Sequence, residues 1–396
     1  MNLTANCRPT LATAVLLAGL AAGCEAPATR QAPTAAPTPP VAPAVVAAAA
    51  TVAAAATADR PFAARRRTQL APRRYVGTVG GEPATAELRW VRPDSVMGRF
   101  YLWRRGTEYS LATATRHRPL ALTLGQAYAY GSQNPGRWQL VQLPGRVLRG
   151  SWVDSAGQHG RPFVLRESYR GSMRYEIQNL TMTGSVAGET AQYSYDFMCL
   201  LGPTTRRRPF SRLQPPPYAE QRRRAMNGEG AANRTSRVEV LLNDFQLLSY
   251  QTYGLVDPFG GENDEDLQNT LVDLATGRQL AIASQLQLHY ALKLRRLLTH
   301  HLLHDPEFDD VNQDHTTSWH WHDANDKPTK LISLPGEREG FALTASGLEA
   351  QYYTHTLYGS GPFWLIKSVF IPYAELRPLV RPSTPLARML RARGLW

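Results

Sequence analysis

The sequence predicts an α+β protein in which a small antiparallel β meander or barrel-like domain precedes a domain with a helix packed on an antiparallel sheet. Short segments rich in β-forming residues follow one another between residues 75 and 167, and turn residues such as Gly80-Gly81 and Pro144-Gly145 separate them. Such spacing is typical of antiparallel meanders. Farther along, one helical segment at about 283–303 lies between strand-like segments, which indicates mixed helix and sheet.

Composition limits the classes to which the chain belongs. Of the 396 residues, 43% are hydrophobic, enough to bury a core, which excludes a globally disordered chain. The net charge of +12 and the pI near 9.8 raise the question of a nucleic-acid partner. Two of the three cysteines fall within the first 24 residues, so a disulfide framework in the body is excluded. The length allows two domains of about 150 residues each.

The first 24 residues have the features of a lipoprotein signal peptide. Arg8 provides a positive charge, and the apolar run Leu11–Leu20 has the length of a signal-peptide core but is too short to span a bilayer. Small residues then precede Cys24, an arrangement that resembles a bacterial lipobox, in which the cysteine is lipidated. We expect Cys24 to anchor the chain in a membrane. An ordinary signal peptide cleaved near Ala22-Gly23 is the alternative.

Residues 25–74 predict an extended, disordered tether. The segment consists mostly of Ala, Pro, Thr, Val and Arg, and it has no periodic apolar face. Arg65–Arg67 and Arg73-Arg74 close it. We expect this segment to be a solvated tail, and contact of its arginines with anionic lipid headgroups is the alternative.

Residues 75–167 predict the barrel-like domain. Glycine permits a bend or bulge in a strand, after which an aromatic side chain packs inside. An eight-stranded barrel either encloses one small ligand or is filled by its own side chains, and we expect a filled interior. A glycine precedes an aromatic residue by two positions in three places: Gly98 and Phe100, Gly136 and Trp138, Gly150 and Trp152.

Most of the excess positive charge lies outside the predicted folded units. Residues 24–74 hold seven arginines and two acidic residues. A Pro-rich insertion at about 202–235 is the second basic segment, with seven arginines and one acidic residue within 200–224. The remaining body is formally neutral, and a signal peptide directs the chain away from cytoplasmic nucleic acid, so we expect no nucleic-acid partner. The insertion belongs to an α+β domain over 168–380, and 381–396 is a C-terminal tail.

Three motifs in the second half carry a family resemblance. They are Asp273-Leu-x-Thr276-Gly277, Phe341-x-Leu343-Thr344-x-x-Gly347-Leu348 and Ile371-Pro372-Tyr373-x-x-Leu376. In this order the region resembles the extracytoplasmic (RsiV-like) domain of lysozyme-sensing anti-sigma factors, a domain of unknown function that also accompanies some peptidoglycan deacetylases. The resemblance implies a helix on an antiparallel sheet and a place outside the cytoplasm. Ser346-Gly347 also suits a hairpin that needs a positive φ.

The chain departs from that family in ways that limit what the resemblance implies. Residues 352–361 replace the family's Tyr-rich turn before the last strand. We find no upstream transmembrane helix or sigma-binding segment, and no deacetylase catalytic domain with its metal-binding carboxylate and histidines. We therefore expect the module without anti-sigma or deacetylase activity.

Seven of the ten histidines cluster in one stretch of the second half. His300 and His304 share a helix face at i, i+4, and His320 and His322 share a strand face at i, i+2. Two helical and two strand imidazoles make a weak candidate zinc site, because their spacing matches no established zinc motif. We therefore expect no metal ion, with these four residues as the candidates for one.

The sequence contains no motif of nucleophilic catalysis that we recognise. Cys199 lies in an apolar run and is expected to be an inert core residue. We find no phosphate loop or dinucleotide fingerprint and expect neither an enzyme nor a cofactor. Two stretches rich in His, Trp and Tyr form the candidate contact surface for a partner. Its residues are Trp319, Trp321, Tyr352, Tyr353, His355 and Tyr358.

Together these observations predict a non-enzymatic lipoprotein of the cell envelope, held to the membrane through Cys24 and facing the periplasm or the cell exterior. Its folded units would bind a cell-wall component or an extracellular protein, and the resemblance makes a lysozyme-like partner conceivable. Two alternatives stay open. One is a metal-dependent hydrolase that uses the histidines from His289 to His322, and the other is a small-molecule carrier that uses the β domain.

Overall fold

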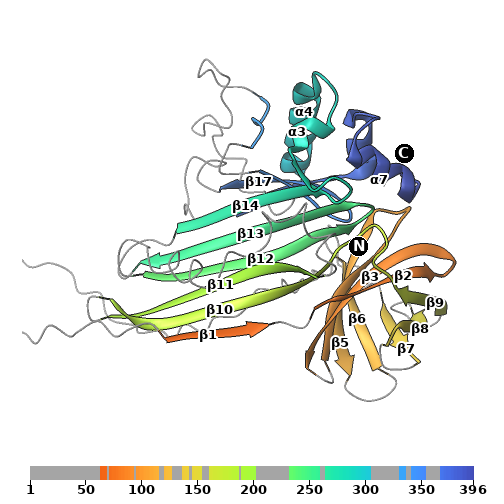
Figure 1. The fold of residues 1–396 in the computed structure, drawn as a ribbon. Helices are drawn as coiled ribbons and strands as arrows, with labels where there is room; N and C mark the ends of the chain where they lie inside the picture. Colours follow the sequence, from red (N-terminus) through yellow and green to blue (C-terminus); the bar gives the residue numbers. More distant parts are fainter. Residues whose placement is uncertain are drawn as a thin grey trace, which may run out of the picture. The chain divides into compact units, whose positions relative to one another are not determined.

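Eight strands of the computed structural model close into an antiparallel barrel (Figure 1). Neighbouring strands pair in sequence order, and the first pairs with the last to close the barrel. The prediction of a β barrel is therefore confirmed. Its strands are β2 (Arg73–Val79), β3 (Glu82–Arg92), β4 (Ser95–Leu102), β5 (Thr107–Thr115), β6 (Leu120–Gln126), β7 (Arg137–Leu140), β8 (Val147–Val153) and β9 (Gly160–Glu167).

The described parts of the chain all belong to one compact unit. The predicted signal peptide with Cys24, most of the tether and most of the basic insertion lie outside them. The structure describes residues 63–68, 71–92, 95–115, 120–126, 136–141, 145–153, 160–186, 189–201, 232–258, 264–304, 330–335, 340–353 and 366–396.

Glycines allow neighbouring barrel strands to approach closely. A Cβ atom on Gly98 would lie 2.0 Å from the carbonyl oxygen of Glu87, and one on Gly150 would lie 2.0 Å from that of Gln139. Both distances are far below van der Waals contact, so only glycine fits without a backbone shift. The sequence pattern of glycine before an aromatic residue therefore marks real close approaches between strands.

Aromatic side chains fill the barrel interior. Phe100 and Trp138 are fully buried with their ring centroids 4.6 Å apart, and Trp138 stacks on Phe163 at 4.4 Å. Tyr109 and Trp152 pack against Phe100 at 4.7 and 5.5 Å. Such ring contacts stabilise the core beyond the burial of apolar area alone. The described interior is thus filled, which counts against the carrier alternative.

A seven-stranded sheet follows the barrel (Figure 1). Its neighbouring strands are antiparallel except for β11 and β12, which are parallel over a short stretch. In spatial order the strands are β1 (Ala63–Thr68), β10 (Arg174–Val186), β11 (Glu189–Leu201), β12 (Ala232–Asp244), β13 (Leu247–Pro258), β14 (Asp264–Asp273) and β15 (Arg278–Leu280).

Strand β1 lies where the sequence predicts a disordered tether. Residues 63–68 pair antiparallel with residues 178–183 of β10, and β2 begins at Arg73. The prediction of disorder for 25–74 is therefore wrong at the C-terminal end of that segment. The sequence of a segment shows whether it has an apolar face of its own. It does not show that the segment can be ordered as an edge strand through backbone hydrogen bonds to an unpaired neighbouring strand.

A three-stranded antiparallel sheet and the helices complete the described fold. Helix α4 packs on strand β18, so a helix does lie on an antiparallel sheet. The described fold is mostly β, however, and the α+β prediction is confirmed only in part. No helix in the described residues is long and apolar enough to cross a membrane. These elements are β16 (Gly340–Leu343), β17 (Gly347–Tyr353), β18 (Ile366–Pro372), α3 (Ile282–Gln285), α4 (Tyr290–His304), α6 (Tyr373–Leu376), the 3-10 helix η5 (Arg377–Leu379) and α7 (Pro385–Arg393).

The single helix predicted over about 283–303 is two helices, α3 and α4. His289, just before α4, has a φ of 65°, which no continuous helix accommodates. The buried face of α4 carries Leu294, Leu298 and Leu302, spaced by four residues. Leucine content alone does not identify that face, because Leu292 is 50% exposed.

The predicted C-terminal tail, 381–396, contains helix α7. The Thr384 side chain accepts a hydrogen bond from the Ala387 backbone N–H, Pro385 occupies the first helical turn, and Gly394 ends the helix with a φ of 72°. These are the residues that start and stop helices. Leu390 and other α7 side chains are buried in the core, so the prediction of a tail is wrong.

We predict that Gly150→Ala destabilises the protein by about 2 to 3 kcal/mol, because the new methyl group would overlap the Gln139 carbonyl oxygen and the Phe163 ring. The matched control is Gly145→Ala, where a Cβ would meet nothing within 4 Å. Urea unfolding of the two variants measures the difference. Equal stability of both variants would contradict the close strand approach.

Candidate functional site

Asp244 links the barrel to the sheet. It lies at the end of β12, and its carboxylate accepts hydrogen bonds from Arg74 of β2, from Thr85 of β3 at 2.8 Å and from Tyr101 of β4 at 2.5 Å. All four residues are at most 3% exposed. A buried charge is tolerated when it is paired with an opposite charge and hydrogen-bonded. For Asp244, Arg74 provides the opposite charge, and residues of three barrel strands donate the hydrogen bonds. Burial, together with the Asp244 charge, raises the pKa of Tyr101 well above its ordinary value, so its hydroxyl remains a donor.

The turn after Asp244 has a strained backbone. Phe245 and Gln246 have φ values of 50° and 64°, the pattern of a type I′ hairpin, which normally favours Asn and Gly. Contacts hold this conformation: the Phe245 ring packs edge-on against Trp103 at 4.8 Å, and the Gln246 N–H donates to the Gly171 carbonyl at 2.6 Å. Non-glycine residues keep such angles only where their surroundings fix them.

Arg393 of α7 connects the C-terminal helix to the same junction. Its side chain is buried, with Nη1 donating to the Ala345 carbonyl at 2.5 Å and Nε to the Trp103 carbonyl at 3.2 Å. The guanidinium also lies 5.1 Å from the centre of the Tyr101 ring and 5.3 Å from that of Tyr373. Barrel, small sheet and α7 therefore meet around one cation.

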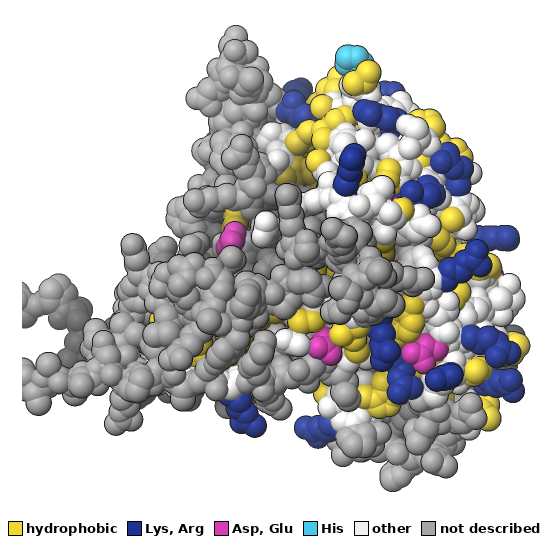
Figure 2. All heavy atoms as spheres, viewed as in Figure 1, with side chains coloured by type: hydrophobic (Ala, Val, Ile, Leu, Met, Phe, Trp, Pro, Cys, Tyr) yellow, Lys and Arg dark blue, Asp and Glu magenta, His cyan; other side chains and the backbone are white. Residues whose placement is uncertain are grey.

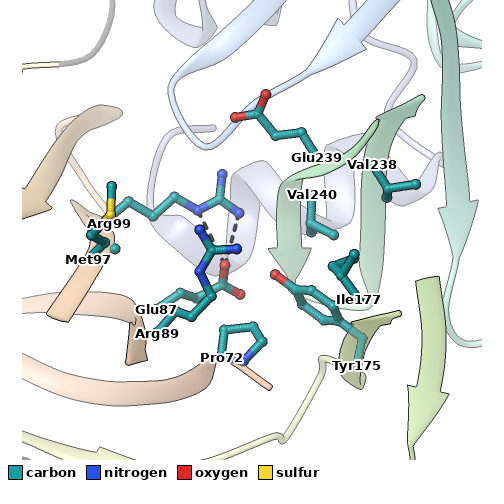
Figure 3. A pocket seen from close by; sticks show the side chains of 11 residues that line it. Pro72, Glu87, Arg89, Met97, Arg99, Tyr175, Ile177, Val238, Glu239 and Val240 are labelled. Atoms are coloured by element: carbon teal, nitrogen blue, oxygen red, sulfur yellow. Dashed lines mark hydrogen bonds and ion pairs between the residues drawn. The ribbon is translucent and has the colours of Figure 1, made fainter. Parts of the chain in front are cut away.

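A pocket of about 260 Å³ lies between the barrel and the sheet. Glu87 and Arg89 of β3 and Arg99 of β4 line it on the barrel side, and Tyr175 of β10 and Glu239 of β12 line it on the sheet side. Figure 3 shows the guanidinium groups of Arg89 and Arg99 close to the Glu87 carboxylate, with the Tyr175 hydroxyl pointing toward them. The pocket thus offers charges of both signs.

Residues of both the barrel and the seven-stranded sheet hold the Arg99 side chain. Its Nε and Nη2 atoms donate to Glu87 at 3.2 and 2.9 Å, while Nη1 donates to Glu108 at 3.3 Å and to the Leu241 carbonyl of the sheet at 2.6 Å. Burial lowers the pKa of Arg99, but the two carboxylates outweigh it and raise that pKa above its ordinary value. Burial raises the pKa of Glu108, and Arg99 opposes that rise. The cation in the pocket wall is therefore fixed in position.

Tyr175 adds a neutral polar group to the pocket. Burial, with a contribution from Glu87, raises the pKa of its phenol above the ordinary value. The hydroxyl therefore stays protonated and both donates and accepts hydrogen bonds. Ile177 and Val240 supply an apolar wall beside it. Fixed charges of both signs, a phenol and an apolar wall suit the binding of a small group that itself carries both charges.

The first motif of the family resemblance builds a turn. The Asp273 carboxylate accepts hydrogen bonds from the Thr276 hydroxyl at 3.0 Å and from Arg388 of α7 at 2.9 Å. Gly277 has a φ of 74°, which favours glycine. Asp273 thus shapes the β14–β15 turn and ties α7 to it, a structural role.

The other two motifs contact each other. The Thr344 hydroxyl accepts from the Gly347 N–H at 3.1 Å, and the Tyr373 hydroxyl donates to the Thr344 carbonyl at 2.5 Å. Gly347 does not have the positive φ that the sequence predicts. It is required for another reason, since a Cβ there would lie 2.2 Å from the Ile371 carbonyl oxygen.

The structure brings two of the four candidate zinc ligands together. His300 and His304 lie on one face of α4 with ring centroids 4.3 Å apart, as predicted. The Nδ1 atom of His304 is 2.7 Å from the His300 carbonyl oxygen, and His301 contacts Glu375 instead. No group of three or more possible metal ligands occurs among the described residues. The other candidates, His320 and His322, lie outside those residues, so the hydrolase alternative stays a prediction.

Two residues of the predicted contact surface are core residues. Tyr352 is fully buried and its hydroxyl donates to the Ser333 carbonyl at 3.0 Å; Tyr353 is 8% exposed and donates to the Glu265 carbonyl at 3.0 Å. Buried side chains do not meet a partner, so the prediction is wrong for both. The remaining residues of that surface lie outside the described part of the chain: Trp319, Trp321, His355 and Tyr358.

The pocket and the Asp244 junction were not among the sequence predictions. Glu87, Arg89 and Arg99 lie on paired strands, and their alternation within otherwise apolar strands was the available signal. Asp244 has no comparable signal, because its partners are separated from it by 143 to 170 residues. Only the fold brings them together.

Comparisons with known proteins find a weak likeness to part of the chain. No family model matches the sequence, and neither does any curated protein. A DUF3298 family member from Bacteroides fragilis is 15% identical, with a TM-score of 0.39, and the match covers 56% of this chain and 99% of that one. A DUF3298 family protein from Pseudomonas aeruginosa is 15% identical, with a TM-score of 0.37 and coverages of 52% and 94%.

We predict that Asp244→Asn lowers the free energy of unfolding by about 3 kcal/mol, because it leaves the buried Arg74 guanidinium without a compensating charge. The control is Asp266→Asn, an exposed aspartate of β14, for which we expect a change within about 0.5 kcal/mol. Urea unfolding measures both. A similar small loss in the two variants would show that the junction does not depend on the Asp244 charge.

Proposed function

We propose that this chain is a non-enzymatic lipoprotein of the cell envelope, anchored through Cys24, whose folded body binds a cell-wall component in the pocket between barrel and sheet. The carrying observation is the lining of that pocket, which Arg89 and Arg99 share with Glu87 and, on the sheet side, with Glu239. The lipobox-like sequence before Cys24 supports the location. The resemblance to the RsiV-like extracytoplasmic domain supports it further.

The chemistry of the pocket favours a cell-wall peptide. Such peptides carry free carboxylates and amino groups on short side chains. Arginine binds carboxylates through paired hydrogen bonds, and Glu239 on the opposite side of the pocket is suited to an ammonium group. The pocket volume of about 260 Å³ takes one or two amino-acid residues rather than a long segment.

The alternative partner of the folded part is an extracellular protein, lysozyme-like or not. A protein partner would cover a surface of roughly 800 Å² on this chain and would not depend on one pocket. The two kinds of partner are therefore distinguished by variants of the pocket lining.

We predict that Arg89→Ala weakens binding of soluble cell-wall peptide fragments about tenfold or more, since a hydrogen bond to a charged group contributes about 1.5 to 3 kcal/mol. Arg92→Ala is the matched control, because Arg92 lies on the same strand, is exposed and does not line the pocket. Isothermal titration calorimetry gives the two dissociation constants. No binding by the unaltered chain, or equal weakening in both variants, would refute the proposed role of the pocket.

Anchoring makes a separate prediction. Cells that express the full chain and are fed a labelled fatty acid should incorporate the label into this protein, and Cys24→Ser should abolish incorporation. Cys7→Ser is the control, because Cys7 precedes the apolar run and should leave labelling intact. Label retained in Cys24→Ser, or lost in Cys7→Ser, would contradict lipidation of Cys24.

A further inference from the structure

The positive charge of the folded part is concentrated in the barrel. Residues 71–167 hold fourteen arginines against six acidic residues, whereas residues 168–396 hold 24 basic and 24 acidic residues. Figure 2 shows Lys and Arg side chains over the part of the surface that the barrel occupies in Figure 1, with few acidic side chains among them. The folded part outside the basic insertion has a net charge of zero, but the barrel within it carries an excess of positive charge.

One outer face of the barrel combines arginines with exposed valines. The N–H of Val141, directly after β7, donates to the Arg149 carbonyl at 2.9 Å, and Arg149 of β8 pairs with Val164 of β9, so the three residues lie in a row. Val141 is 80% and Val164 41% exposed. Arg166, two positions after Val164, points to the same side and is exposed like Arg149. We call these four residues the β8–β9 face.

No described residue on the outward side of β7, β8 or β9 is acidic. Among the described residues of these three strands, the arginines of the β8–β9 face therefore have no acidic neighbour on the outward side. The pocket lies on other strands, β3 and β4, so the β8–β9 face is separate from it.

We propose that the β8–β9 face binds the surface of an anionic lipid bilayer. Guanidinium groups bind phosphate through paired hydrogen bonds, and exposed apolar side chains enter the boundary between headgroups and acyl chains. An anionic bilayer presents phosphates and an apolar boundary together, which matches arginines that alternate with valines. An acidic polymer would match only the arginines. The proposal depends neither on the pocket nor on lipidation of Cys24.

The test uses the purified full chain carrying Cys24→Ser, so that no acyl chain contributes. We expect it to float with vesicles of phosphatidylcholine and phosphatidylglycerol, and much less with phosphatidylcholine alone. Adding Arg149→Gln and Arg166→Gln should weaken binding to the anionic vesicles about 25-fold, at about fivefold for each arginine near the surface. Raising the salt concentration should weaken binding of the unaltered face as well.

The matched control adds Arg278→Gln and Arg377→Gln, which remove the same charge from exposed positions outside the barrel and should leave binding within about twofold. Equal losses in the two double variants would show that only net charge matters and would overturn the proposal. Binding kept by the Arg149/Arg166 double variant would assign it to residues outside the β8–β9 face and would overturn the proposal too. So would binding to soluble polyphosphate without binding to vesicles.

Discussion

The arrangement of the described fold depends on one buried carboxylate. Asp244 lies at the tip of a sheet hairpin, but its hydrogen bonds come from barrel strands β2, β3 and β4. A carboxylate buried at this depth needs the partners that the barrel supplies, so barrel and sheet fix one another. The pocket follows from this constraint, because one of its walls belongs to the barrel and the other to the sheet, which Asp244 joins.

The barrel could be predicted from local signals, whereas the junction could not. Glycine spacing and alternation are properties of neighbouring residues, so Gly98 and Phe100 reveal a close approach between strands beside an inward ring. The Thr384-Pro385 start and the Gly394 stop of α7 were equally local signals, although the sequence interpretation did not use them. Asp244 and Arg74 are 170 residues apart, and a buried pair at that separation leaves no periodic trace in sequence.

The three motifs of the family resemblance build turns and contacts within this fold. Asp273 hydrogen-bonds within its own turn and to Arg388 of α7, whereas Tyr373 donates to the Thr344 carbonyl. Arg393 of α7 donates to the neighbouring Ala345 carbonyl. The chain pairs these polar groups internally because an unpaired buried polar group is costly. Fold and function are therefore separable here, and function has to be sought on surfaces that the motifs do not build.

The charge distribution shows where such surfaces lie. A folded part whose net charge is zero outside the basic insertion can still have one basic face. Bilayers and polymers respond to the local electrostatic potential within about 10 Å rather than to the total charge. The arginines of the barrel divide into two groups with different environments. Arg74 and Arg99 are neutralised by carboxylates and hold the fold together, whereas Arg149 and Arg166 face solvent beside exposed valines. The second group is exposed toward a large surface, so burial, rather than arginine content, decides which side of the barrel meets such a surface.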